Sequence, residues 1–382
     1  MGAVHRTEFA GAAVASRGRR RIALVGAAVA GVGTSFDNVC RAAAADPDYE
    51  PVPVPVRPYR ADAVERFAGF LPASTRGTLR SIAATGPLFS RRPFQAVWTQ
   101  IDLPLLPWML TRNVANGIPV VYAADSTPRL IRGFGPLYAN WGGTSRAKQR
   151  VRDALHGLCL RRCAAVTAWS RWAAASMRDD YGVDPSRLHV IPPGVDTSLW
   201  SPAAAKPDEG RPARILFVGG DFKRKGGDLL LDLYRRHFRR GAELDLVTRG
   251  DAAAPEAGVR VHDNLGSNDA RLIQLYRAAD LFVLPTRADC FSIASLEAMA
   301  AGLPVVTCPV GGVGELFSDG TEGFFVAPDD GAALRAAIDA LVSNPNRRRD
   351  MAVAARQRAL SAFDANINTQ RIFRLIDSLS AA

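Results

Sequence analysis

The sequence predicts an α/β fold divided into two domains. Short apolar runs with the length of buried strands alternate with longer segments of good helix formers, which is typical of parallel sheets covered by helices. The chain has 382 residues, enough for two domains that each bury a core of their own. No apolar stretch reaches the ~20 residues that a membrane-spanning helix needs, so we expect no transmembrane segment.

The first domain is expected over residues 21–196. Residues 1–20 are small or polar without periodicity, which predicts a disordered leader. An apolar run at residues 22–25 predicts the first buried strand, residues 26–33 a glycine loop, and residues 34–44 a helix. Further strands of the same sheet are predicted at residues 52–56, 94–98 and 119–123.

The second domain is expected over residues 213–365, after a linker at residues 197–212 that contains three prolines. A last helix and tail are expected over residues 366–382, and residues 323–328 predict a hairpin-like return. Strands are predicted at residues 214–218, 244–248, 259–262, 281–284 and 303–306. Helices are predicted at residues 228–238, 330–341, 347–363 and 366–379.

The turn and helix between the last two predicted strands carry the most informative residues. Asp289 lies in the turn and Glu297 on the helix. Ser292 stands at the position of a helix N-cap, which leaves the backbone N–H groups of Ile293 and Ala294 pointing above the sheet edge. N–H groups at a helix N-terminus bind phosphate when they lie at the carboxyl end of a parallel sheet. An anion site is therefore predicted here.

The order of these residues resembles the nucleotide-sugar site of family 4 retaining glycosyltransferases. In that family Glu-Gly-Phe-Gly is followed after four residues by Glu-Ala-Met-Ala, and here the two motifs stand as Asp289-Cys290-Phe291-Ser292 and Glu297-Ala298-Met299-Ala300. The resemblance implies the GT-B fold, in which two Rossmann-like domains face across a cleft and a C-terminal helix crosses back to the first domain. It also implies that Glu297 binds the donor ribose and that Asp289 contacts the donor sugar. The donor site would further include Phe291, Ser292, Ile293 and Ala294.

A glycine-rich loop at residues 219–227 carries three consecutive cations. The resemblance implies that Lys225 grips the donor diphosphate. The family also has an arginine after the first glycine, where this chain has Gly220, which leaves Arg224 or Lys223 as the candidate replacement. Because glycine lets a phosphate approach the backbone, this loop is expected to form the second part of the anion site.

Three other parts of the chain follow from the same resemblance. Gly31 and Gly33 lie in the glycine loop that approaches the diphosphate and the acceptor in the family. Many members carry a histidine near Asp125 that contacts the donor sugar, but none of the five histidines here falls at that point, so Asp125 is expected to stand in for it. Leu265 lies in the loop that receives the nucleobase.

The resemblance predicts a retaining hexosyltransferase that uses a UDP- or GDP-linked sugar, in the synthesis of cell-surface polysaccharide or glycolipid. Lys225, Asp289 and Asp125 are the predicted catalytic residues. We expect no metal or other cofactor, because Lys225 and a helix N-terminus can stabilise a leaving phosphate. The segment Asp46-Pro47-Asp48 mimics a metal-binding Asp-x-Asp, but it lies in a proline-rich segment and not after a hydrophobic strand. Two alternatives are an idle GT-B protein that serves as a binding or regulatory subunit, and a nucleotide-sugar epimerase of the same fold.

Basic residues are concentrated in the first half of the chain. Residues 1–200 carry 25 Arg and Lys against 14 Asp and Glu, whereas residues 201–382 carry 23 of each. The helix predicted at residues 143–163 could therefore lie on an anionic membrane and meet a lipid-linked acceptor. A core-facing stripe with a solvated basic face explains that helix equally well.

Partners and compartment follow from composition. No nucleic acid is expected as a partner, because the basic half has no interleaved aromatic platform. Five cysteines without a paired spacing predict reduced thiols. We therefore expect a cytoplasmic protein, with peripheral contact at the inner face of the membrane left open.

Overall fold

The computed structural model describes most of the chain. The described residues are 19–27, 30–56, 73–89, 94–102, 105–109, 117–138, 145–203, 210–249, 254–263 and 265–380. The predicted leader up to residue 18, residues 204–209 of the predicted linker and residues 143–144 of the predicted basic helix lie outside these ranges. No helix within these ranges is long and apolar enough to cross a membrane.

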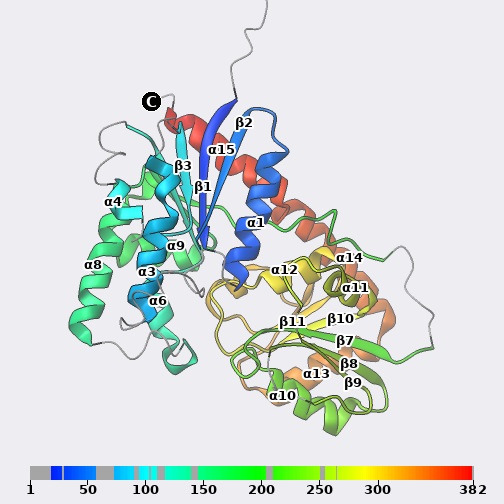
Figure 1. Ribbon diagram of the computed structural model, residues 1–382. Coiled ribbons are helices and arrows are strands. Elements are labelled where there is room, and N and C mark those ends of the chain that lie inside the picture. The colour runs from blue at the N-terminus through cyan, green and yellow to red at the C-terminus, as the bar shows by residue number, and fades with distance from the viewer. Residues whose placement is uncertain are drawn as a thin grey trace, which may run out of the picture.

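The first domain is built on a parallel sheet with the strand order β2-β1-β3-β4-β5-β6 (Figure 1). Its strands are β1 Arg20–Ala27, β2 Tyr49–Val56, β3 Ala96–Thr99, β4 Val120–Ala124, β5 Ala165–Ala168 and β6 Leu188–Val190. The strands β3 and β5, which have a neighbour on each side, are buried along their whole length, which explains their mainly apolar sequences. The helices are α1 Ala30–Ala44, α3 Ala73–Ala84, α4 Leu106–Trp108, α6 Pro128–Gly133, α8 Arg146–Arg162 and α9 Arg171–Asp179, with 3-10 turns η1 Gly86–Phe89, η4 Gly135–Tyr138 and η5 Pro185–Arg187.

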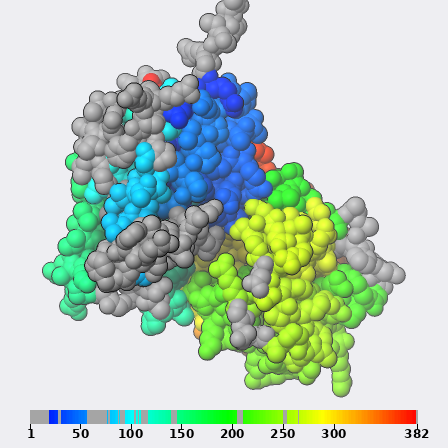
Figure 2. Space-filling model, viewed as in Figure 1, coloured from blue at the N-terminus to red at the C-terminus, as the bar shows by residue number. Residues whose placement is uncertain are grey.

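The second domain repeats this plan with the strand order β12-β11-β10-β7-β8-β9. Its strands are β7 Ala213–Val218, β8 Ala242–Val247, β9 Val259–His262, β10 Leu281–Leu284, β11 Val305–Thr307 and β12 Gly323–Phe325. Its helices are α10 Gly227–Leu233, α11 Ala270–Ala278, α12 Ile293–Ala300, α13 Gly331–Val342 and α14 Pro345–Ala362, with a π-turn η6 Tyr234–Phe238 and a 3-10 turn η7 Gly311–Glu315. In Figure 2 the two domains form adjacent lobes, blue to cyan and green to yellow.

Two local predictions are wrong. The first helix begins at Ala30, so Gly31 and Gly33 lie in its first turn and not in a preceding loop. A Cβ atom on Gly31 would lie 3.4 Å from Cγ1 of Ile293, so glycine lets α1 approach α12 of the other domain. The predicted hairpin-like return is instead strand β12, which pairs in parallel with β11.

The last helix, α15 Ala365–Ser380, packs on the first sheet and confirms the predicted crossover (Figure 1). Phe373 is 2% exposed, and its ring stacks on that of Tyr49 with centroids 3.9 Å apart. The carboxylate of Asp377 accepts hydrogen bonds from Tyr49 and Arg20. An apolar face and one polar cluster therefore hold the end of the chain on the first domain.

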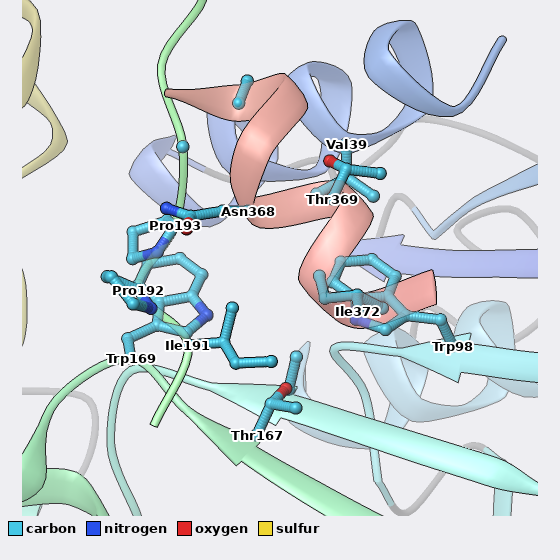
Figure 3. Close-up of a pocket in the computed structure, with 13 residues that line it drawn as sticks. Val39, Trp98, Thr167, Trp169, Ile191, Pro192, Pro193, Asn368, Thr369 and Ile372 are labelled. Atoms are coloured by element: carbon cyan, nitrogen blue, oxygen red, sulfur yellow. The ribbon is translucent and has the colours of Figure 1, made fainter. Parts of the chain in front are cut away.

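A small cavity lies where α15 meets the first sheet, between Thr369 and Ile372 on one side and Trp98 and Trp169 on the other (Figure 3). Its volume is about 10 Å³, close to the minimum for one water molecule. Trp98 Nε1 and Thr369 Oγ1 are buried there without a hydrogen-bond partner in the described part of the chain. The cavity therefore suits a single structural water and is too small for a substrate.

The chain crosses between the domains twice, and the two crossing segments lie side by side. The backbone N–H of Val195 donates to the carbonyl of Phe363 over 2.8 Å, and the N–H of Ala365 donates to the carbonyl of Val195 over 2.9 Å. The hydroxyl of Thr197 also donates to the carboxylate of Asp364. The connection between the domains is thus a short two-stranded ladder.

The packing of α15 can be tested with Phe373→Ala. Removing a buried aromatic ring should lower the free energy of unfolding by about 3–5 kcal/mol, because the cavity cannot fully collapse. Urea denaturation followed by circular dichroism measures this. Ile367→Ala is the matched control, since Ile367 lies on the same helix and is 46% exposed. Equal stability of the two variants would mean that α15 is not held through Phe373.

Candidate functional site

Lys225 and Asp289 form an ion pair at the carboxyl edge of the second sheet. Lys225 lies in the loop after β7 and Asp289 in the loop after β10, and these strands are neighbours. Only 15% of the lysine side chain and 8% of the aspartate side chain are exposed. Because each charge compensates the other away from water, these two predicted catalytic groups hold each other in place.

Two glycines fix the loop that carries Asp289. Gly226 has φ +77°, and a Cβ atom there would lie 2.0 Å from the carbonyl oxygen of Pro285. Gly311 has φ +58°, and its Cβ would lie 2.2 Å from the carbonyl oxygen of Asp289. Glycine alone combines such backbone angles with such close approach. The loop is therefore clamped from both sides, which sets the position of Asp289.

The N-terminus of α12 forms the predicted cap. Ser292 Oγ accepts a hydrogen bond from the backbone N–H of Ser295 at 3.3 Å. The N–H groups of Ile293 and Ala294 have no acceptor within the ranges that the structure describes. Two oriented donors therefore remain for an anion beside the ion pair.

Glu297 lies one turn further along α12 and is 5% exposed. The hydroxyl of Tyr276 donates to Glu297 Oε2 at 3.2 Å. Burial raises the pKa of Glu297 to about 8, and the hydrogen bond from Tyr276 offsets only part of that increase. A carboxyl group with this pKa gains negative charge only when the pH rises or when a ligand donates hydrogen bonds to it.

Arg224 has most of its hydrogen-bonding capacity engaged. Its guanidinium donates to the carboxylate of Asp221 at 3.0 Å and to the carbonyl of Ala288 at 2.8 Å. It also lies over the ring of Tyr138, 4.8 Å from the ring centroid. Arg224 therefore lies beside the loop that carries Asp289 and links the two domains. Its role as the replacement for the family arginine stays a prediction.

Arg249 is a cation that the sequence analysis missed. A Cβ atom on Gly220 would lie 3.5 Å from both Cδ and Nε of Arg249, so the arginine side chain passes directly over this glycine. Arg249 is exposed, and no ion-pair partner is found for it in the part of the chain that the structure describes. The position of Arg249 could have been predicted from a parallel pairing of β7 with β8, because this pairing places the carboxyl ends of the two strands side by side.

Asp125 joins the site from the first domain. It follows β4 and accepts a hydrogen bond from the hydroxyl of Ser126 at 2.8 Å. Burial is the main cause that raises the pKa of Asp125 to about 6, and the charge of Asp289 adds to the increase. Asp125 therefore carries its carboxyl group on the first domain within the electrostatic range of Asp289.

The two domains are in contact around the site. The ring of Phe291 meets that of Trp169 edge to face, with centroids 6.1 Å apart. Phe291 therefore packs in the domain interface, and a direct contact with the donor stays a prediction. The carboxylate of Glu315 accepts hydrogen bonds from the first two N–H groups of α9, both at 2.9 Å. A residue of the second domain thus caps a helix of the first.

The remaining predicted donor residues lie at the edges of this region. Gly33 is buried in α1, two residues after Gly31, which contacts α12. Leu265 is half-buried in the loop after β9. Close to it, the hydroxyls of Ser267 and Thr34 lie 2.7 Å apart and connect this loop to α1.

The Asp46-Pro47-Asp48 segment has a structural role. Asp46 accepts a hydrogen bond from the backbone N–H of Asp48 at 2.8 Å and another from Gln370 on α15. In the residues that the structure covers, no three His, Cys, Asp or Glu side chains are grouped so that they could hold a metal ion.

Sequence comparison identifies both domains. A family model described as glycosyltransferase family 4 matches residues 29–199, and one described as glycosyl transferases group 1 matches residues 203–358. The two matches together include every strand of both sheets except β1. The chain belongs to the family 4 glycosyltransferases.

Relatives of this glycosyltransferase differ in their names. It is 31% identical over 240 residues to the MMP alpha-(1->4)-mannosyltransferase of Mycolicibacterium hassiacum and 35% identical over 237 residues to the glycogen synthase of Mycobacterium tuberculosis. These matches cover 60% and 58% of this chain, but only 55% and 56% of the relatives. A D-inositol 3-phosphate glycosyltransferase of Segniliparus rotundus is 26% identical over 84% of this chain and 75% of its own length.

Solved structures confirm the GT-B architecture. The sucrose-phosphate synthase of Thermosynechococcus elongatus superposes with a TM-score of 0.72 over 95% of this chain and all of its own, at 19% identity. The HepE protein of Anabaena in complex with UDP-glucose gives a TM-score of 0.67 over 94% of this chain and 99% of its own, at 17% identity. At such low identity, these similarities concern the fold alone.

Proposed function

We propose that the protein is a retaining hexosyltransferase that takes a sugar from a nucleotide diphosphate donor without a metal ion. The observation that carries this proposal is the Lys225–Asp289 pair, which lies in the loops beside the N–H groups of Ile293 and Ala294 at the start of α12. Membership of the family and the complex of HepE with UDP-glucose support a nucleotide sugar as the donor.

The proposed chemistry separates charge between the sugar and the departing diphosphate. The ammonium of Lys225 and the N–H groups of Ile293 and Ala294 would stabilise the negative charge on the leaving phosphate. Asp289 and Asp125 would face the sugar, where positive charge develops. The leaving phosphate would take the proton of the acceptor hydroxyl on the same face of the sugar, so a pair of carboxyl groups of the glycosidase type is not required.

The names of the relatives cover several classes of acceptor. The relatives are named for a mannosyltransferase, a glycogen synthase and an inositol phosphate glycosyltransferase, which are different acceptor classes. We propose a role in cell-surface polysaccharide or glycolipid synthesis in the cytoplasm. Contact with an anionic membrane is supported by exposed Val151 among the basic residues of α8.

An idle binding subunit is the second candidate. Two observations favour it: the chain has Gly220 where the family has an arginine, and the guanidinium of Arg224 already donates hydrogen bonds to Asp221 and Ala288. The two candidates differ in one measurable property, because a transferase releases nucleotide slowly from its donor even without an acceptor. Incubation with UDP- and GDP-linked hexoses, with and without EDTA, tests this directly.

Lys225→Ala should reduce donor turnover by ~10²-fold or more, the scale of one lost transition-state contact. The release of UDP or GDP is followed at saturating donor. Arg335→Ala, which removes a half-exposed cation from α13, is the control and should keep full turnover. Release that resists EDTA and depends on Lys225 supports the proposal, whereas turnover unchanged in Lys225→Ala removes this residue from the mechanism.

The affinity for the nucleotide should depend on pH through Glu297. If the ribose hydroxyls donate to its carboxylate, binding requires the ionised form, which is the minor form below its pKa of about 8. Affinity for UDP or GDP should therefore increase about tenfold between pH 7 and pH 9. Titration calorimetry measures this. Glu297→Gln should bind the nucleotide more weakly, with an affinity that does not depend on pH. If the variant keeps the pH dependence of the wild type, the ribose role is contradicted.

Arg249→Ala should weaken binding of the donor diphosphate about tenfold, the scale of one charged hydrogen bond. Titration calorimetry with the nucleotide, repeated at low and high salt, should show a smaller salt dependence than in the wild type. If affinity and salt dependence match those of Arg335→Ala, Arg249 does not replace the missing arginine.

A further inference from the structure

A polar cavity of about 140 Å³ lies at the carboxyl edge of the first sheet. Its walls come from the ends of β3, β4 and β5 and from helices α1, α6 and α8. The polar side chains that line it include Gln100, Asp102, Asp125, Arg152 and His156. Only Asp125 among these was predicted as a site residue from the sequence.

His156 is the most deeply buried of these groups, with 2% of its surface exposed. Its Nδ1 is hydrogen-bonded to the carboxylate of Asp102. The rings of Tyr181 and Tyr122 contact it edge to face, with centroids 4.8 and 6.0 Å away. The ring is therefore held on three sides, and an ionised Asp102 selects the tautomer in which Nδ1 carries the proton.

The opposite ring nitrogen has no such bond. His156 Nε2 is buried without a hydrogen-bond partner anywhere in the described ranges, and so is Oε1 of Gln100. A buried polar atom left without a partner costs about 1–3 kcal/mol. Two such acceptors in the lining of one cavity would be satisfied by a ligand that carries hydrogen-bond donors.

The cavity adjoins the proposed transfer site. Asp125 lies in its wall, and the charge of Asp289 contributes to the raised pKa of Asp125. Trp169 also lines it and packs on Phe291 of the second domain. A ligand in the cavity would therefore lie next to the loop that carries Asp289.

The lining is rich in acceptors. Nε2 of His156 in this tautomer, Oε1 of Gln100 and the carboxylate of Asp125 all accept hydrogen bonds. Hydroxyl groups donate to such atoms, whereas a phosphate has only acceptor oxygens at neutral pH. Arg152 also lines the cavity, but the negative charge of Asp102, another lining residue, acts on its guanidinium. The cavity therefore favours neutral hydroxyl groups over phosphate.

We infer that this cavity binds the hydroxyl groups of a neutral polyol portion of the acceptor, such as a sugar ring or a cyclitol. His156, oriented by Asp102, accepts a hydrogen bond from one of these hydroxyls. The inference rests on the proposed transferase function, because an acceptor exists only if sugar is transferred. Hydroxyls of the donor hexose have the same chemistry, and the experiment distinguishes the two sources.

The test compares His156→Phe and Asp102→Asn with the wild type. Asp102→Asn nearly keeps the shape of the side chain but removes the charge that selects the tautomer, so it remains informative if His156→Phe fails to fold. His262→Gln is the matched control, since His262 forms the same kind of pair with Asp245 in the second domain, at 2.8 Å.

Two rates are measured with UDP- and GDP-linked hexoses. The first is donor hydrolysis without acceptor, and the second is transfer to glucose, maltose and myo-inositol and to their phosphorylated counterparts. We expect the wild type to prefer the neutral polyols. The ratio of transfer to hydrolysis should fall ~10–100-fold in both variants, mainly through acceptor KM. His262→Gln should keep the wild-type ratio.

Other outcomes overturn the inference in distinct ways. If hydrolysis and transfer fall together, the cavity holds the donor hexose and not the acceptor. If neither rate changes, or if phosphorylated acceptors are preferred, the cavity does not select neutral hydroxyls.

A binding measurement separates this inference from the proposed function. Saturation-transfer NMR with glucose, maltose and myo-inositol needs no turnover. If the wild type fails to hydrolyse any donor, the transferase proposal fails. If the polyols give saturation-transfer signals with the wild type but not with the two variants, the polyol site is still supported. If they give no signal with the wild type, the inference is overturned.

Discussion

The ion pair between Lys225 and Asp289 is the interaction on which the arrangement of the site depends. It joins the loops after two neighbouring parallel strands, and parallel strands place such loops at one edge of the sheet. The close approach of Gly226 to Pro285 and of Gly311 to Asp289 leaves the acidic loop little freedom. A charge pair held so firmly would already be arranged when a substrate arrives, which would lower the reorganisation needed in the proposed reaction.

The sequence was most informative where function and local structure depend on consecutive residues. The cap at Ser292, the acid at Asp289 and the helix carrying Glu297 lie within nine residues, so spacing alone relates them to one another. The α/β class was also predictable, because apolar periodicity marks its strands and helices, and the crossover of α15 followed from the family resemblance. These features need no knowledge of how distant segments pack.

Other residues of the site could not be predicted, because their neighbours are set by tertiary structure. Arg249 reaches Gly220 only through the pairing of β8 with β7, and His156 meets Asp102 only because α8 packs over the end of β3. The direction of β12 was predicted wrongly for a similar reason, since three residues carry no periodicity that distinguishes a parallel partner from a hairpin. Spatial proximity across the sheet edge is thus the information that the linear pattern lacked.

The ladder that joins the domains also limits how they can move. The backbone of Val195 is hydrogen-bonded to the backbones of Phe363 and Ala365. The two segments of the chain that connect the domains therefore lie next to each other. Two domains that are connected along a single line can rotate about that line, whereas the hydrogen bonds of the ladder oppose translation along it. A rotation of the two domains about this ladder would displace residues in proportion to their distance from it, and would separate the carboxylate of Glu315 from the N–H groups of α9.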